Sequence, residues 1–196
     1  MKQLSKDSLQ KLIDDLSLTD RISLSDIPEM ALYMDQLLTF LDGKLSSFKR
    51  VGDDKLLTKT MINNYTKIGL IPKPFNKKYD TYHIILLILI FNLKNVLSIS
   101  DIQSLFTPIL KNIDTPDDDV IPLREIYSTF LELKQNEYME FTSTFNEKHQ
   151  EIKEKTLTAT DKQLAELFLT VIMLVAQANA SKRLAEKIID QFFKNL

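Results

Sequence analysis

Apolar residues recur at helical spacing along most of the chain, which predicts a mainly helical protein. The first amphipathic stretch predicts a helix over residues 5–16. A second helix is predicted to begin near Asp26, because Pro28 fits the first helical turn, and to end around Gly43. The apolar face of this second helix carries Met30, Leu32, Tyr33, Leu37, Leu38 and Leu41.

A short helix is predicted over residues 59–68. Thr58 precedes it as a capping residue, and Gly69 is placed to end it in a left-handed conformation. One side of this helix is mostly apolar, with Met61, Ile62, Tyr65 and Ile68. The opposite side gathers hydrogen-bonding and cationic groups, namely Lys59, Thr60, Asn63, Asn64 and Lys67.

A basic, extended turn follows the short helix. Proline fixes its own backbone and biases the preceding residue away from helix, so Pro72 and Pro74 are expected to keep this segment extended. The turn carries three lysines and ends in a tyrosine, at Lys73, Lys77, Lys78 and Tyr79.

Two more helices and a linker complete this part of the chain. Asp80 is predicted to cap a nearly all-apolar helix over residues 81–95, and Ser98 with Asp101 forms the capping box of the next helix. The aspartate-rich segment 114–119 is the clearest linker. We therefore expect an N-terminal helical domain over residues 1–113 and a C-terminal helical domain over residues 114–196.

The residues after the linker predict a helical bundle. Pro122 is placed to open a long helix over residues 123–152 with an apolar and aromatic stripe. Thr160 opens a capping box for a helix over residues 161–178, and a last helix is predicted over residues 181–196.

Composition supports the all-α class. Only 3 glycines and 6 prolines occur, too few for the many turns of a sandwich or barrel. The apolar runs at residues 84–91 and 167–176 reach about half of the ~20 residues that a membrane-spanning helix needs, so we expect buried helices and no membrane segment. The chain has no cysteine and starts without a signal-peptide pattern, so we expect a cytoplasmic protein.

Charge is unevenly distributed along the chain. Residues 44–82 contain nine basic and three acidic residues, a net charge of +6, whereas the remainder carries −8. Such a local excess is typical of a surface that meets phosphates, and the alternative is a solvated, lysine-rich face.

The central motifs resemble two known families. The order of a short helix, Tyr65 followed by Gly69 and Leu70, a basic turn and an apolar helix resembles the winged helix-turn-helix of MerR-type transcription regulators, over residues 55–106. The segments LTKTMINNYTKIGLIPKP, KKYDTYHI and LKNVLSISDI resemble, more specifically, a bacterial family known as domain of unknown function 1836.

The MerR resemblance implies a DNA-binding role. The helix at residues 59–68 would lie in the major groove, and the turn at residues 73–79 would contact the backbone as a wing. The implied contact residues are Thr58, Lys59, Thr60, Asn63, Asn64, Tyr65, Lys67, Lys73, Lys77, Lys78 and Tyr79. The chain departs from the MerR pattern in having asparagines at 63 and 64 in place of Arg-Tyr, and Asn76, Lys77 and Lys78 in place of Gly-Tyr-Arg; it also lacks the glycine expected after Val96.

The chemistry of these residues agrees with that role. Asparagine can bond bidentately to adenine, and lysine and hydroxyl side chains serve phosphates. For Asn63 and Asn64 the alternative is a solvated helix face. For Tyr65 and Tyr79 core packing is the alternative, and we favour it over direct base contact.

A catalytic role is not indicated. His83 and His149 are distant in sequence, and His83 fits a packed or capping position. The aspartates at 117–119 read as a solvated linker rather than a cation site. No metal-ligand spacing, phosphate loop or nucleophile elbow occurs, so we expect no enzyme activity, metal or cofactor.

The sequence therefore predicts a DNA-binding transcription regulator that recognises double-stranded DNA. The rival hypothesis is a helical protein-interaction adaptor that keeps the helix-turn-helix shape without binding DNA. A third possibility is an effector sensor whose C-terminal helices enclose a small molecule. Because residues 167–175 leave almost no polar face, we also expect a homodimer joined through the C-terminal domain, with intramolecular core as the alternative.

Overall fold

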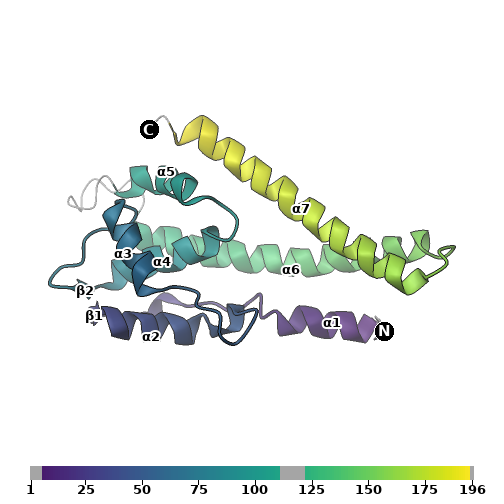
Figure 1. The fold of residues 1–196 in the computed structure, drawn as a ribbon, viewed down its shortest axis with the longest axis horizontal. Coiled ribbons are helices and arrows are strands. Elements are labelled where there is room, and N and C mark those ends of the chain that lie inside the picture. The colour runs from purple at the N-terminus through teal and green to yellow at the C-terminus, as the bar shows by residue number, and fades with distance from the viewer. Residues whose placement is uncertain (1–5, 111–121, 195–196) are drawn as a thin grey trace. The chain divides into compact units, whose positions relative to one another are not determined.

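The structure, a computed structural model, describes residues 6–110 and 122–194, and this part of the chain is mainly helical (Figure 1). The predicted mainly-α class is confirmed, with the addition of one short antiparallel sheet. The elements in chain order are α1 (Lys6–Asp15), a 3-10 helix (Leu24–Asp26), β1 (Leu32–Tyr33), α2 (Met34–Lys44), a 3-10 helix (Ser46–Phe48), α3 (Lys59–Lys67), β2 (Lys78–Tyr79), α4 (Thr81–Leu93), α5 (Ile99–Leu110), α6 (Leu123–Lys155) and α7 (Lys162–Phe192).

The described residues form two compact units. The hairpin unit comprises residues within 1–20 and 132–184, and the core unit comprises those within 21–131 and 185–196. The predicted linker at 114–119 and the predicted domain boundary after residue 113 lie outside the described residues, so both stay predictions.

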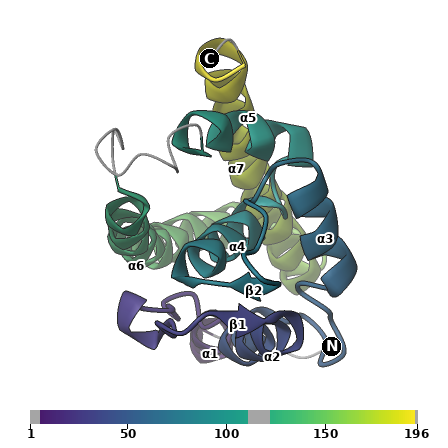
Figure 2. The same cartoon turned by 90° about the vertical axis from the view of Figure 1, so that its left-hand side faces the viewer.

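Helix α4 lies in the middle of the core unit, with α2, α3, α5 and the first turns of α6 around it (Figure 2). Its residues from His83 to Phe91 are all buried. An isolated helix with so little polar surface would be unstable in water, so the neighbouring helices supply the cover that it needs. The prediction that the run at 84–91 is a buried helix is confirmed.

The start of the second predicted helix was wrong. Residues Leu32 and Tyr33 pair with Tyr79 and Lys78 as an antiparallel ladder, which requires extended backbone there. Helix α2 consequently begins at Met34, and the side-chain oxygen of Gln36 accepts the N–H of Tyr33 at 2.9 Å. Asp26 belongs instead to a 3-10 helix, and Pro28 lies before the strand.

The predicted capping residues of the central segment are confirmed, whereas α3 and α4 end one and two residues earlier than predicted. The hydroxyl of Thr58 accepts the N–H of Met61 at 3.2 Å at the start of α3. Gly69 follows α3 with a φ of +74°, a conformation that favours glycine. The carboxylate of Asp80 accepts the N–H of His83 at 3.1 Å at the start of α4, and Ser98 caps α5 through the N–H of Asp101.

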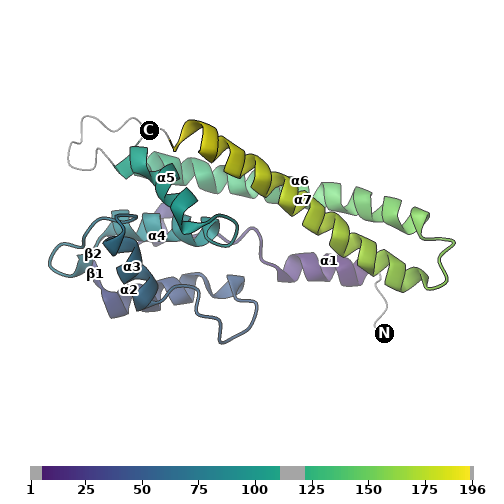
Figure 3. The same cartoon turned by 45° about the horizontal axis from the view of Figure 1, so that its top comes forward.

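The hairpin unit is built on α6 and α7, which run antiparallel (Figure 3). Helix α1 lies beside α6, since Ile13 and Asp14 line the same pocket as Tyr138 and Thr142. Pro122 opens α6 as predicted, since its carbonyl accepts the N–H groups of Glu125 and Ile126. Two helices were predicted after residue 160, but α7 is continuous, because the segment around residues 178–181 contains no glycine or proline to break it. Asp161, not Thr160, caps α7, by accepting the N–H of Leu164 at 3.0 Å.

The predicted burial of residues 167–176 was also wrong. Only one side of α7 is covered within the hairpin unit, and Thr170 is the sole fully buried residue between 167 and 176. Large apolar side chains are exposed along the rest of the helix, namely Leu164, Phe168, Leu169, Val171, Ile172, Val175 and Leu184. By length and composition alone, α7 could also cross a membrane.

A buried ionic cluster joins α6 to α7. The Nε2 atom of His149 lies 2.9 Å from Oε1 of Glu166, and Nζ of Lys153 lies 3.8 Å from the same oxygen. His149 also stacks on Phe145, with 5.8 Å between the ring centroids. Burial and the nearby Lys153 ammonium lower the pKa of His149 below its ordinary value of 6.5, outweighing the attraction of the Glu166 carboxylate.

This lowered pKa predicts a loss of stability in mild acid. Below 6.5 the unfolded chain binds a proton at His149 more readily than the folded chain does, so the free energy of unfolding should fall as the pH drops from about 7.5 to about 5.5. Denaturant titrations at several pH values measure this free energy of unfolding. The His149→Gln variant should show a shallower pH slope, whereas Gln150→Ala, at an exposed neighbouring position, should keep the parental slope. Equal slopes in all three proteins would contradict the prediction.

Candidate nucleic-acid interface

Helix α3 presents a continuous polar face to solvent. Because a helix repeats every 3.6 residues, five of the six predicted contact residues on this helix fall on one side, and these five are exposed: Lys59, Thr60, Asn63, Asn64 and Lys67. Figure 2 shows α3 at the periphery of the core unit rather than in its centre. The face offers two amides, a hydroxyl and two ammonium groups to a partner.

The opposite side of α3 anchors it to the core. Ile62 and Tyr65 are buried, and burial raises the pKa of the Tyr65 phenol. The backbone carbonyl of Tyr65 accepts N–H groups from Leu70 at 2.8 Å and Ile71 at 3.4 Å. Tyr65 therefore fixes both the helix and the turn that follows it, in agreement with the core-packing interpretation of this residue.

The C-terminal end of α3 is held by α5. The side-chain amide of Gln103 donates to the carbonyl of Ile68 at 2.6 Å. At the other end, the hydroxyl oxygen of Thr58 is used in capping and its side chain is half-buried. Both ends of α3 are thus tied down, and the polar face between them has a fixed orientation relative to the rest of the core unit.

The predicted wing is a tight hairpin between α3 and β2. The N–H of Lys78 donates to the carbonyl of Phe75 at 2.9 Å, and the two central residues, Asn76 and Lys77, have φ values of 49° and 62°. Positive φ at both central positions is typical of a type I′ turn, whose twist matches that of a hairpin. Lys73, Lys77 and Lys78 are exposed around it.

Strand β1 supports this wing from the side. Its residue Tyr33 pairs with Lys78, and the Lys78 ammonium lies 5.1 Å from the centroid of the Tyr33 ring. Tyr79 is buried, and this burial raises the pKa of its phenol. Its ring packs edge-to-face with that of His83, with 5.4 Å between the ring centroids. Like Tyr65, Tyr79 is placed for packing rather than for contact with a partner.

The base of the wing is joined to α4 through Asp80. Although burial alone raises the pKa of the Asp80 carboxyl, hydrogen bonds from the His83 ring and backbone lower it below the ordinary value. Nδ1 of His83 lies 2.7 Å from Oδ1 of Asp80. His83 is therefore a capping histidine, as the sequence analysis favoured.

The lysines of the basic segment differ in whether an acidic side chain pairs with them. Lys44 pairs with Asp26 at 2.8 Å and Lys49 with Asp42 at 2.7 Å, so these two lysines are locally compensated. Within the described residues, no ion pair involves the lysines of α3 and the wing, at positions 59, 67, 73, 77 and 78. The basic excess seen in the sequence is thus concentrated on these two elements.

Sequence reasoning missed Phe75. The side chain of this residue is 81% exposed at the edge of the wing turn. Phenylalanine is usually buried, so its residue type alone does not indicate an exposed contact position. The usable signal was its place between Pro74 and the turn residue Asn76, where no strand or helix can bury it.

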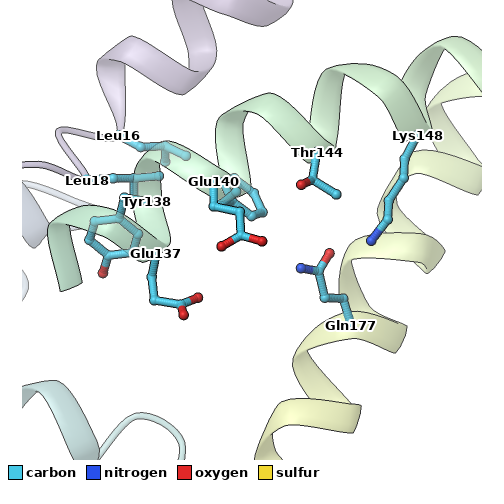
Figure 4. Close-up of a pocket in the computed structure, with 9 residues that line it drawn as sticks. Leu16, Leu18, Glu137, Tyr138, Glu140, Thr144, Lys148 and Gln177 are labelled. Carbon is cyan, nitrogen blue, oxygen red and sulfur yellow. The ribbon is translucent and has the colours of Figure 1, made fainter. Parts of the chain in front are cut away.

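The hairpin unit contains a cavity of about 570 Å³ (Figure 4). Leu16, Leu18 and Phe141 give it apolar surface, whereas Glu140 and Lys148 on α6 and Gln177 on α7 place polar groups around it. Its volume is in the range of small-molecule sites. In the described part of the chain, no three metal-ligating side chains cluster.

The comparisons with known proteins identify a family but no characterised relative. No curated protein and no solved structure matches the chain. The model of the family named domain of unknown function 1836 matches residues 22–130, which contain the α3 face, the wing and α4. This match covers more than half of the chain, so the protein belongs to the domain of unknown function 1836 family.

Proposed function

We propose that this protein is a DNA-binding transcription regulator. The observation that carries the proposal is the pairing, in one unit, of an exposed amide-bearing helix face with a lysine-rich hairpin, whose lysines form no ion pair with any acidic residue that the structure describes. Lysines without acidic neighbours attract phosphates, and asparagine amides can read adenine edges in the major groove. We propose no reaction, cofactor or metal.

The order of elements supports a MerR-like winged helix. Strand β1 precedes α2 and α3, and it pairs with the strand that closes the wing, so the wing is tied back to the start of the motif. In this proposal α3 lies in the major groove and the wing lies along the adjacent backbone. Thr58, Tyr65 and Tyr79 orient these elements, and the exposed residues make the contacts.

A homodimer joined through α7 is the second part of the proposal. Four exposed side chains, Leu164, Phe168, Val171 and Val175, follow the alternating four- and three-residue spacing of a helix-pairing seam. Soluble monomers rarely expose a continuous apolar patch of this kind. One DNA-binding unit of this size contacts few bases. Two such units related by a two-fold axis would favour inverted-repeat sites.

The same apolar face favours the adaptor hypothesis if DNA binding fails, because α7 would then dock a different protein. The cavity shown in Figure 4 is where we would place a small-molecule effector, since it lies in the unit that carries the proposed dimer seam. Binding there would shift the orientation of α6 relative to α7 and so reach the seam.

Neutralising the wing should weaken binding to all DNA sequences. Replacing Lys73, Lys77 and Lys78 by glutamine removes phosphate contacts, so affinity should fall and the salt dependence should flatten by up to about three phosphate equivalents. Fluorescence anisotropy with random duplex DNA at two salt concentrations measures both. A control that replaces Lys155, Lys162 and Lys187 removes the same charge elsewhere. If the two triple variants bind alike, the wing assignment is wrong.

Removing an amide from α3 should relax sequence preference. Asn63→Ala or Asn64→Ala should cost roughly 1–3 kcal/mol at one base position and leave nonspecific binding nearly intact. Selection from a random duplex pool, followed by sequencing, gives the preference of each variant. Asn136→Ala, at an exposed asparagine of α6, is the matched control. Unchanged preferences in both α3 variants would remove the recognition role of this helix.

Placing charge on the α7 seam should separate the dimer. Phe168→Glu with Val171→Glu should convert a sedimenting dimer to a monomer, because buried like charges would face each other across the seam. Leu133→Glu, at an exposed leucine of α6, should leave the dimer intact. A monomeric parent protein, or a parent recovered with membranes after salt washing, would contradict this part of the proposal.

A further inference from the structure

The wing turn carries an aromatic side chain that the proposed phosphate contacts do not use. Among the described residues, Phe75 has the largest exposed fraction of any large apolar side chain in the protein. It lies beside three lysines, on the loop between α3 and β2 that projects from the core unit (Figure 3). A single exposed apolar residue on a surface needs no explanation, but this one stands on a rigid, basic projection.

The turn holds Phe75 in a defined position. Its carbonyl accepts the N–H of Lys78, and the preceding residue, Pro74, has a fixed φ. The second central position of a type I′ turn is normally glycine, but here Lys77 adopts a φ of 62°. A lysine in this strained conformation keeps a positive charge at the tip of the turn, two residues after Phe75.

We propose that Phe75 is a wedge that inserts between two base pairs from the minor groove when the protein binds DNA. This inference rests on the proposed function. Lysines at 73, 77 and 78 supply the charge that draws a hairpin toward a narrow, strongly negative minor groove. An apolar side chain at the tip can then unstack one base step, as phenylalanine does in minor-groove proteins that kink DNA.

The wedge assigns a specificity role to the wing. Pyrimidine–purine steps such as TA and CA unstack most easily, so preferred sites should contain one at a fixed distance from the bases read by α3. An exposed phenylalanine among lysines could also insert into an anionic membrane surface. We favour DNA because the wing and the amide-bearing face of α3 belong to the same unit and are joined by only five residues, from Ile68 to Pro72.

The absence of tryptophan from the sequence allows a direct test. The Phe75→Trp variant would carry a single tryptophan, whose emission should be quenched on binding a duplex selected by the parent protein, because the indole stacks on bases. Val96→Trp, at an exposed apolar position beyond the far end of α4, is the matched control and should not respond. The 13 residues of α4 span about 20 Å, which separates the two reporters.

A second measurement uses the DNA. In the selected duplex, 2-aminopurine placed at one flexible step should brighten when the parent protein binds, and the Phe75→Ala variant should abolish this change. Phe75→Ala should also weaken binding roughly tenfold while leaving the salt dependence unchanged, since no cation is lost. A loss of affinity with an unchanged salt dependence distinguishes a wedge from a phosphate contact.

The outcomes distinguish the wedge from the proposed function. If the parent protein binds no DNA, both fail. If it binds DNA but the Phe75→Trp emission and the 2-aminopurine signal stay constant, the wedge is overturned and the proposed function stands. Emission of the Phe75→Trp variant that responds to vesicles containing about 30% phosphatidylserine, but not to DNA, would overturn the wedge in favour of membrane insertion.

Discussion

Helix α4 must be covered on every side, and the rest of the core unit depends on this requirement. From His83 to Phe91 the helix has no solvated face, so α2, α3, α5 and the start of α6 each bury one side against it (Figure 2). Each covering helix contributes its apolar side and turns its polar side outward. For α3, the outward side is the one with two asparagines and the lysines. Burial of α4 is thus the reason that these groups are exposed together and in a fixed direction.

The same constraint fixes the wing. The cap of α4 is Asp80, which directly follows β2, so the hairpin ends where the buried helix starts. Strand β1 adds a ladder to the other edge of β2, and Tyr79 packs inward against His83. These contacts leave only the turn itself free to project. A rigid base with an exposed, strained tip is an arrangement that places a side chain into a groove without ordering cost at the time of binding.

Local rules explain which features could be predicted from the sequence. Thr58, Gly69 and Asp80 act on backbone groups within four residues of themselves, so their roles as caps were accessible without tertiary information. The strand at Leu32 was not, because it forms only by pairing with residues more than forty positions away. The exposure of Phe75 and of the apolar run of α7 likewise depends on tertiary packing. Whether an apolar side chain is covered depends on which helix packs beside it, and periodicity does not contain that information.

Helices α4 and α7, which contain the long apolar runs at residues 84–91 and 167–176, therefore serve opposite purposes. In α4, apolar contacts hold the unit together and polar groups are confined to the ends. In α7, the contact with α6 contains the buried Glu166–His149 pair, while the larger apolar side chains face away from α6. Because the pKa of His149 is lowered, its imidazole is mostly uncharged at neutral pH, and desolvation offsets much of the attraction between the two side chains, so the pair contributes less to stability than to the choice of a particular register. The α6–α7 contact is therefore suited to fixing a geometry, whereas the apolar side chains of α7 that could supply association energy are exposed on its other side.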